Sequence, residues 1–410
     1  MKYQAWLLAL TLSICGFAHA QTQKPLAQKR LRAELLPSDG TAEMGFGIVA
    51  VSGNVVAVTA GSTPGSVYLY PRLSKGTVNQ IAKLSASDGA GLFGVAVGEN
   101  GRLVVAGAPN ETIRNHPKQG AVYVFVEPAS GWTGNITETA KLTASDGGKT
   151  NHDQLGSSVS TTNGVIVAGA PQYDGVGDGT GEAYVFVEPK EGWVSGRETA
   201  RLTASNGHPS DAFGDTVSVQ GPTIVVGAPG VNHSEGAAYV FQKSADGWKT
   251  KTETAELSHP GTAEFFGNAA VWGKTIVVGA EFSPPTGAAY IYVEPSGGWV
   301  STDNPNATLT EAGAKCLGDT VAIGPAMIAL GDECVRYGHP VRFTGDSVVY
   351  LTPSGGWKDS SNGIVLRPEG GQQNSIVAVE KNNVIVGSPW TTVGNNAYEG
   401  AAFIYTIPAQ

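Results

Sequence analysis

Short runs of Val, Ile, Tyr and Thr, separated by turns that contain glycine, recur along almost the whole chain. The stretch FGDTVSVQGPTIVVGAPG, from Phe213 to Gly230, is a clear example. Runs of this kind are typical of β-strands and hairpins, and no segment carries a sustained helical period. We therefore predict an all-β protein in which this stretch forms an inner strand, a tight turn and a second strand. Val217, Val219, Ile224 and Val226 would supply its buried side chains.

The same stretch is repeated with variations. Its Phe-Gly start recurs, as do its Gly-Ala-Pro end, a following phrase such as GAVYVF, a Gly-Trp turn and a run such as ETAKLTASDG. We count seven copies, roughly 47 to 62 residues apart, slightly longer than common propeller repeats. Gly214 and Gly227 are predicted to lie where neighbouring backbones approach closely. The starts of the first six copies are Phe46-Gly47, Phe93-Gly94, Leu155-Gly156, Phe213-Gly214, Phe266-Gly267 and Leu317-Gly318.

Four strands in each of seven copies predict a seven-bladed β-propeller, with a core made of the layers between neighbouring blades. The last copy ends in FIYTIPAQ, a third-strand phrase, whereas RAELLPSDG near the start of the chain matches the fourth-strand run TAKLTASDG. We therefore predict that Arg32–Leu36 completes blade seven and closes the ring. Residues 32–410 would form the propeller, and residues 21–31 a short segment before it.

The first twenty residues have the features of a secretory signal peptide. Lys2 precedes an apolar stretch, and Ala18-His19-Ala20 fits a cleavage site. We expect an exported protein, located in the periplasm, at the cell surface or outside the cell. The 410-residue chain has a net charge of −9 and contains 56 glycines. The negative charge argues against nucleic acid and anionic membranes as partners, and no later segment is long and apolar enough to span a bilayer.

The recurring Phe-Gly, Gly-Ala-Pro and VYVF phrases resemble the FG-GAP repeat of the integrin α-subunit propeller and its bacterial exported relatives. The resemblance covers nearly all of the chain after Arg32, and it implies a propeller that uses one face to bind partners. Many such repeats carry a calcium loop between the first two strands of a blade. The corresponding turns here hold at most one carboxylate, whereas calcium needs six to eight oxygen ligands. The calcium sites of the family are therefore not expected at these turns.

Two other groups of residues are candidates for metal binding or catalysis. Asp174, Asp178 and Glu182 lie in a glycine-rich loop that either wraps a calcium ion or is a solvated turn. Asp153 and Asp211 lie in linkers between blades, where a cluster of acids and histidines could bind a metal or act in acid–base chemistry. The alternative is ordinary turn chemistry. The remaining linker residues of this kind are His152, His208, His259 and Glu264.

Aromatic and charged residues in irregular loops are the candidates for ligand binding. Trp390 and Tyr398 lie in the loop between the second and third strands of blade seven. Arg114 and His116 lie in the equivalent loop of blade two, and Tyr173, together with Asp174, lies in that of blade three. All these loops should share one face with the linkers between blades. The Gly-Trp turns, in contrast, are interpreted as a packing feature because they fall at one fixed point of the repeat.

Cys316 and Cys334 flank the first two strands of blade six. In an antiparallel hairpin they would lie opposite or nearly opposite each other, which suits a disulfide bond in an exported protein. The alternative is a pair of free buried thiols.

Three functions remain open. We favour an exported, non-catalytic binding protein that uses one propeller face to engage a protein or a glycan. The alternatives are a carbohydrate-active enzyme, such as a polysaccharide lyase or hydrolase, and a structural or adhesion component of a surface assembly. The chain carries no HExxH, GxSxG, P-loop or dinucleotide-binding motif, so no reaction is indicated.

Overall fold

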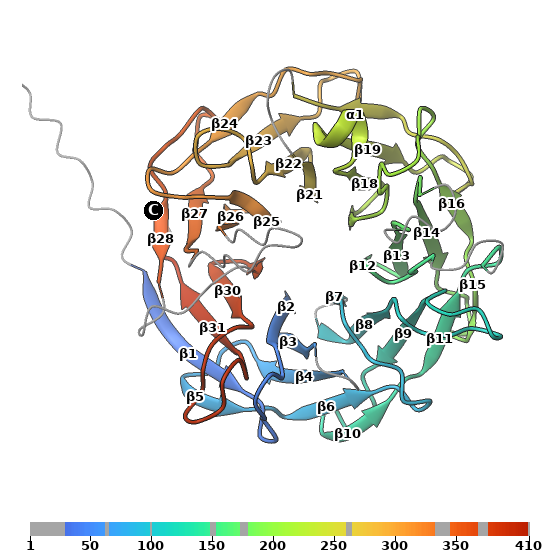
Figure 1. Ribbon diagram of the computed structural model, residues 1–410, viewed down its shortest axis with the longest axis vertical. Coiled ribbons are helices and arrows are strands. Elements are labelled where there is room, and N and C mark those ends of the chain that lie inside the picture. The colour runs from blue at the N-terminus through green and yellow to red at the C-terminus, as the bar shows by residue number, and fades with distance from the viewer. Residues whose placement is uncertain are drawn as a thin grey trace, which may run out of the picture.

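The computed structural model describes residues 29–61, 65–98, 101–147, 153–172, 179–259, 265–332, 345–367 and 376–408. In these ranges the strands form seven sheets arranged as the blades of a ring (Figure 1). The predicted all-β, seven-bladed propeller of four-stranded blades is confirmed. The single helical segment of the described residues, α1 (Val231–Ser234), contains two residues with left-handed backbone angles and is a turn between two strands.

Each blade runs outwards from the centre of the ring in four antiparallel strands. The first strands, which line the centre, are β2 (Phe46–Ser52), β7 (Val95–Gly98), β12 (Ser158–Thr162), β17 (Thr216–Gln220), β21 (Phe266–Trp272), β25 (Leu317–Ile323) and β29 (Ile376–Glu380). The second strands are β3 (Val55–Ala60), β8 (Leu103–Ala108), β13 (Val165–Ala170), β18 (Thr223–Ala228), β22 (Thr275–Ala280), β26 (Met327–Asp332) and β30 (Asn383–Ser388).

The third strands are β4 (Ser66–Pro71), β9 (Ala121–Val126), β14 (Glu182–Val187), β19 (Ala237–Gln242), β23 (Ala288–Val293), β27 (Ser347–Leu351) and β31 (Ala401–Thr406). The outer, fourth strands are β6 (Ala82–Ser85), β11 (Ala140–Thr143), β16 (Ala200–Leu202), β20 (Ala255–Leu257), β24 (Ala307–Leu309), β28 (Ile364–Leu366) and, in blade seven, β1 (Arg30–Leu36).

The ring closes in blade seven, where β1 pairs with β31 in antiparallel orientation. Arg30 lies opposite Thr406 and Leu35 opposite Ala402, so strands from the two ends of the chain form one blade. The predicted closure by Arg32–Leu36 is confirmed, and the strand begins two residues earlier than expected. Closure removes the open blade edges that an unclosed array would expose.

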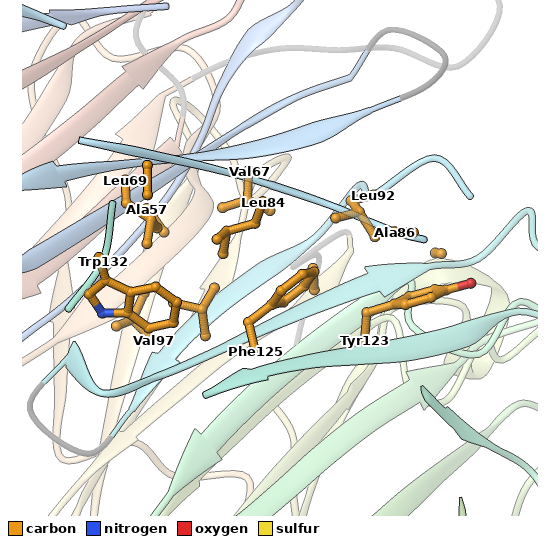
Figure 2. Close-up of a cluster of buried hydrophobic side chains, with 14 of the residues drawn as sticks. Ala57, Val67, Leu69, Leu84, Ala86, Leu92, Val97, Tyr123, Phe125 and Trp132 are labelled. Atoms are coloured by element: carbon orange, nitrogen blue, oxygen red, sulfur yellow. The ribbon is translucent and has the colours of Figure 1, made fainter. Parts of the chain in front are cut away.

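Buried side chains of the described residues form seven clusters, each shared by two neighbouring blades. Figure 2 shows the cluster between blades one and two, in which Leu69 and Leu84 of blade one face Phe125 and Trp132 of blade two. The core of the protein is therefore the set of layers between blades, as predicted. The Gly-Trp tryptophans belong to these layers, and four of them are buried: Trp132, Trp193, Trp248 and Trp299.

The repeated stretch that begins at Phe213 is explained by contacts within and between blades. Phe213 is fully buried, with its ring centroid 5.4 Å from that of Tyr239 and 6.0 Å from that of Phe241. A Cβ atom on Gly227 would lie 1.9 Å from the carbonyl oxygen of Gly267 in the next blade, so only glycine fits there. The phrase is a unit of construction, and Val217, Val219, Ile224 and Val226 lie in the layer between blades three and four.

The fourth strands of most blades carry an additional element that the sequence pattern did not indicate. The connection between the third and fourth strands of one blade pairs in parallel with the fourth strand of the preceding blade. We call these pairing residues the edge segment of a blade. Three edge segments form strands of their own: β5 (Gly76–Asn79), β10 (Gly134–Thr137) and β15 (Gly196–Arg197).

A serine and a glutamate connect neighbouring blades next to the edge segments. The Ser87 amide and hydroxyl donate to the Glu138 carboxylate at 2.8 and 2.6 Å. We call this arrangement the Ser–Glu clasp. At the closing joint, Ser38 and Gln80 take the same places, since the Ser38 amide donates to Gln80 Oε1 at 3.0 Å. Two further clasps join Ser145 to Glu198 and Ser205 to Glu253.

Cys316 is buried, and its backbone N–H donates to Asp332 Oδ1 at 2.6 Å. Asp332 lies opposite Leu317 in the hairpin of β25 and β26. Cys334 lies outside the described residues, so the Cys316–Cys334 disulfide stays a prediction.

Candidate functional site

The loops between second and third strands lie on the same face of the ring as the linkers between blades. Gly120, at the end of such a loop in blade two, pairs with Leu155 at the start of blade three. Gly181 pairs with Phe213 in the same way at the next joint. We call this side the loop face. The candidate loop and linker residues that the structure describes share this face, as the sequence predicted.

The loops of blades two and seven have the same conformation, although their sequences differ. In blade two, the amides of Ile113 and His116 each donate to the other's carbonyl, at 3.1 and 2.9 Å. In blade seven, Val393 and Asn396 make the same pair of bonds, at 3.1 and 2.9 Å. Arg114 lies at the tip of its loop and is exposed, with φ of 50°, and His116 is half-buried. A non-glycine residue with this φ is uncommon, which indicates a loop held in a defined shape.

The loop of blade seven presents a pair of aromatic rings. Trp390 and Tyr398 meet edge to face, with ring centroids 6.4 Å apart and an interplanar angle of 79°. Tyr398 is 45% exposed and has φ of 55°, whereas Trp390 is half-buried. In the same loop, the buried carboxylate of Glu399, next to Tyr398 in the chain, accepts a bond from Asn396 Nδ2 at 2.6 Å. This bond helps to hold the loop that carries the two rings.

Blade one, which lies between blades two and seven, has a much shorter loop. Residues 61–65 join its second and third strands, whereas residues 109–120 and 389–400 make the corresponding connections in blades two and seven. The two longer loops thus flank a blade whose connection between second and third strands is shorter. Arg114 and the Trp390–Tyr398 pair lie on opposite sides of it.

The structure corrects one part of the repeat and adds a candidate residue. Phe93 is not the equivalent of the buried Phe213, because Leu92 occupies that place and is 1% exposed. The Phe93 amide donates to the Gly107 carbonyl, just as the Gly214 amide donates to the Gly227 carbonyl. Blade two is one residue shorter here, so Phe93 takes the position of a glycine and is 46% exposed. Phe93 is a candidate that the sequence pattern concealed, because Phe-Gly was assigned to the core.

The Asp211 carboxylate bonds within its own linker turn, and both described linker aspartates are buried. Asp211 is 5% exposed, and its Oδ2 accepts a bond from the His208 amide at 2.7 Å. Asp153 is also 5% exposed. His259 stacks on Tyr290 at 4.0 Å, and burial lowers the pKa of its imidazole. These contacts fit the turn interpretation of the linkers, while His152 and Glu264 lie outside the described residues.

Of the acidic loop in blade three, the structure describes only Glu182. Its carboxylate accepts a bond from the Tyr184 hydroxyl and lies 3.4 Å from Arg201 Nη1. Burial raises the pKa of Glu182. Tyr173, Asp174 and Asp178 lie outside the described residues, so the proposed calcium loop stays a prediction. Among the residues that the structure does describe, no three His, Cys, Asp or Glu side chains are placed to hold a metal ion.

Comparison with known families and structures fits this architecture. The FG-GAP repeat family matches residues 78–125, 136–186 and 197–241, which are three consecutive repeats. The chain is an FG-GAP repeat β-propeller protein. No curated protein sequence matches it.

Solved structures similar to this FG-GAP propeller share its fold at low sequence identity. The WD40 β-propeller domain of Doa1 is 14% identical, with a TM-score of 0.54, over 92% of this chain and 97% of that one. The WD40 domain of Toxoplasma gondii coronin is 10% identical, with a TM-score of 0.55, over 94% and 87% of the two chains. These likenesses concern the fold alone. Within the described ranges, no helix is long and apolar enough to cross a membrane.

Most of the turns between first and second strands of the FG-GAP propeller are too short for a calcium site. Most of them contain two residues between the strands, for example Gly53-Asn54 in blade one and Gly273-Lys274 in blade five. Two residues cannot surround an ion that needs six to eight oxygen ligands. These short turns simply connect the two strands of a tight hairpin.

An acidic pair lies where the loop face meets the centre of the FG-GAP propeller. Asp215 precedes β17 and is half-buried. Burial, together with the nearby charge of Glu281, raises the pKa of Asp215 to about 7. This carboxyl group therefore changes its charge close to neutral pH.

Proposed function

We propose that this FG-GAP propeller is an exported, non-catalytic binding protein that engages a partner protein through its loop face. β-Propellers with FG-GAP repeats generally serve in protein interactions, and a rigid ring that carries irregular loops suits that role. The observation that carries the proposal is the Trp390–Tyr398 ring pair, in which Tyr398 is exposed, in a loop that the Asn396–Glu399 bond helps to hold. Rigid aromatic side chains contribute strongly to binding at protein interfaces.

Further support comes from the residues around this pair. Arg114 is exposed on the matching loop of blade two, and Phe93 is exposed near the centre of the ring. Arg and aromatic residues are enriched at the core of interfaces. A partner lying over blade one would contact both flanking loops at once.

Export is part of the proposal and rests on the amino-terminal sequence. Amino-terminal sequencing of the protein from its native culture medium or envelope should begin at Gln21, after Ala20. A protein that retains Met1 and remains in the cytosol would contradict the export step.

The binding site can be tested with a photo-crosslinking amino acid at position 398 in the mature protein. The crosslinked partner should be identified by mass spectrometry, and its affinity measured for Trp390→Ala and Arg114→Ala. We expect each change to weaken binding at least about tenfold, as for interface hot spots. Trp272→Ala is the matched control, because Trp272 is 41% exposed but lies by the turn between first and second strands on the opposite face.

If the Trp272 change weakens binding and the Trp390 change does not, the interface lies on the opposite face and the proposal fails. A glycan array run with the same variants distinguishes a glycan ligand from a protein partner. Saturable glycan binding that depends on Trp390 would mean that the ligand is a glycan rather than a protein, and that it still binds at the loop face.

A further inference from the structure

Edge segments cover the outer strands of several blades with a recurring set of hydrogen bonds. In blade four, the Glu256 amide donates to Ser301 Oγ at 3.0 Å. The Thr302 amide then donates to the Glu256 carbonyl at 3.0 Å, and the Ser258 amide donates to the Thr302 carbonyl at 3.1 Å. The side-chain acceptor in the other blades with this arrangement is Ser195, Thr250 or Asp359.

Blade six differs because of how the ring closes. An edge segment comes from the connection between third and fourth strands of the next blade. In blade seven those strands are β31 and β1, which lie at opposite ends of the sequence and have no such connection. Among the described residues, no segment pairs with the outer side of β28.

The outer side of β28 is marked by Val365, the equivalent of Glu256. Its carbonyl points outwards, since it accepts a bond from Lys29 Nζ at 2.5 Å. The amides of Val365 and Arg367 occupy the positions of the Glu256 and Ser258 amides. Lys29 is exposed, and its side chain contacts the strand edge at the place where an edge segment pairs through its backbone in other blades. A lysine at a sheet edge is a known way of limiting uncontrolled strand addition.

A cavity of about 150 Å³ lies beside this edge. Its walls include Leu309, Tyr350, Trp357 and Ile364, with Asn362 as a polar group. Trp357 is half-buried, unlike the four buried Gly-Trp tryptophans of other blades. An open strand and an adjacent pocket are the two parts of a site for strand addition, since the strand gives affinity and the pocket gives specificity.

The charges around the site favour an acidic occupant. Lys358 lines the cavity and is exposed, and Lys29 reaches the edge itself. Arg367 is exposed and pairs with Asp346, at 2.5 Å between Nη2 and Oδ2. The nearby Asp359 already accepts a bond from the Thr308 amide at 2.8 Å.

We propose that the outer edge of β28 binds an extended acidic segment of a partner protein, added in parallel to the strand. A serine, threonine or aspartate of the segment accepts a bond from the Val365 amide, as Ser301 does from Glu256. An apolar side chain of the segment enters the cavity beside Trp357. This site lies on the rim of the ring and is distinct from the loop face.

The probe is a synthetic peptide of residues 298–305, GWVSTDNP, which is the edge segment of blade five. Within the protein, its counterpart covers blade four, so the free peptide should find its vacant equivalent at blade six. We expect saturable shifts of the Val365 and Arg367 amide resonances of the mature, full-length protein. A peptide with the Ser301→Ala change should bind several-fold more weakly, and a scrambled peptide should not bind.

Val365→Pro removes the outward amide, and we expect it to weaken peptide binding at least tenfold. Arg367→Glu provides a second variant that keeps the backbone and should weaken binding of the acidic peptide. Trp272→Ala is the control for an exposed aromatic change elsewhere. Peptide binding unaffected by both blade-six variants would overturn the proposal.

Amide hydrogen exchange of the free mature protein supplies an independent check. Val365 and Arg367 should exchange much faster than Glu256 and Ser258, which the edge segment of blade five covers. Equal protection would mean that the protein's own amino-terminal residues occupy the edge, and this result would also overturn the proposal.

Discussion

Replacing Asp215 by asparagine should stabilise the folded protein at neutral and alkaline pH. The ordinary pKa of this carboxyl group is 3.8, and burial raises its pKa to about 7 in the folded state. Below about pH 4 the group is protonated in both states and makes no difference to stability. Between pH 4 and pH 7 the unfolded chain releases the proton while the folded protein keeps it, so the free energy of unfolding falls as the pH rises.

The size of the effect follows from the difference in pKa. Each unit is worth about 1.4 kcal/mol, so the shift from 3.8 to about 7 destabilises the folded protein by about 4 kcal/mol above pH 7. Asp215→Asn removes this penalty. The variant should therefore equal the parent near pH 4 and exceed it by up to about 4 kcal/mol at pH 8.

Equilibrium urea unfolding at pH 4, 5.5, 7 and 8 measures the difference directly. Glu281→Gln should give a smaller effect of the same sign, because the charge of Glu281 is the second cause of the shift. Asp246→Asn, at an exposed turn, is the control. A difference between Asp215→Asn and its parent that is the same at pH 4 and pH 8 would refute the reasoning.

Two further changes test the joints between blades, and a thiol titration tests the predicted disulfide. Gly227→Ala places a Cβ atom 1.9 Å from a carbonyl oxygen of the next blade, so we expect a loss of more than about 4 kcal/mol, read as insoluble or unfolded protein. Gly297→Ala, with no atom within 4 Å of the new Cβ, should fold normally, and equal behaviour of the two would contradict the packing account. Glu138→Ala removes both bonds of one Ser–Glu clasp and should cost about 1 to 2 kcal/mol in urea unfolding; an unchanged midpoint would show that the clasp adds nothing. Thiol titration of the denatured mature protein should find no free thiol before reduction and two after it if Cys316 and Cys334 are bridged, and two in both cases if they are not.

The fold could be predicted from the sequence because every blade has the same packing requirements, so the same residue types return at the same positions of each repeat. The positions of Phe213 and Gly227 recur since each blade needs a large buried apolar side chain, Phe or Leu, and a point of close backbone approach. Closure was predictable for the same reason. The fourth-strand sequence of blade seven lies near the start of the chain, at Arg32, but it still resembles the fourth strands of the other blades.

The edge segments were not predictable from the sequence. They pair in parallel with a strand of another blade, and this pairing produces no local alternation of apolar and polar residues. The register of blade two was predicted wrongly at Phe93. One residue is missing there, so Leu92 lies in the core, although the sequence still reads Phe-Gly at positions 93 and 94. Such a shift is visible only in the hydrogen bonds of the neighbouring strand.

The candidate site was predicted in location but not in shape. Loop residues such as Arg114 and Trp390 stood out because they break the repeat, and strand polarity places them on one face. The common conformation of their two loops could not be inferred, since it depends on backbone bonds between residues as different as His116 and Asn396.

The pairing of β1 with β31 also determines how the ring responds to mechanical force. Arg30 lies opposite Thr406, so the chain enters and leaves blade seven at the same end of the same strand pair. A pull that separates these two ends opens the hydrogen bonds one after another, as a zipper opens, and never loads them all together. The ring is built from seven similar blades, yet tension applied through its ends would act on one strand pair of one blade alone, in the direction in which that pair is weakest.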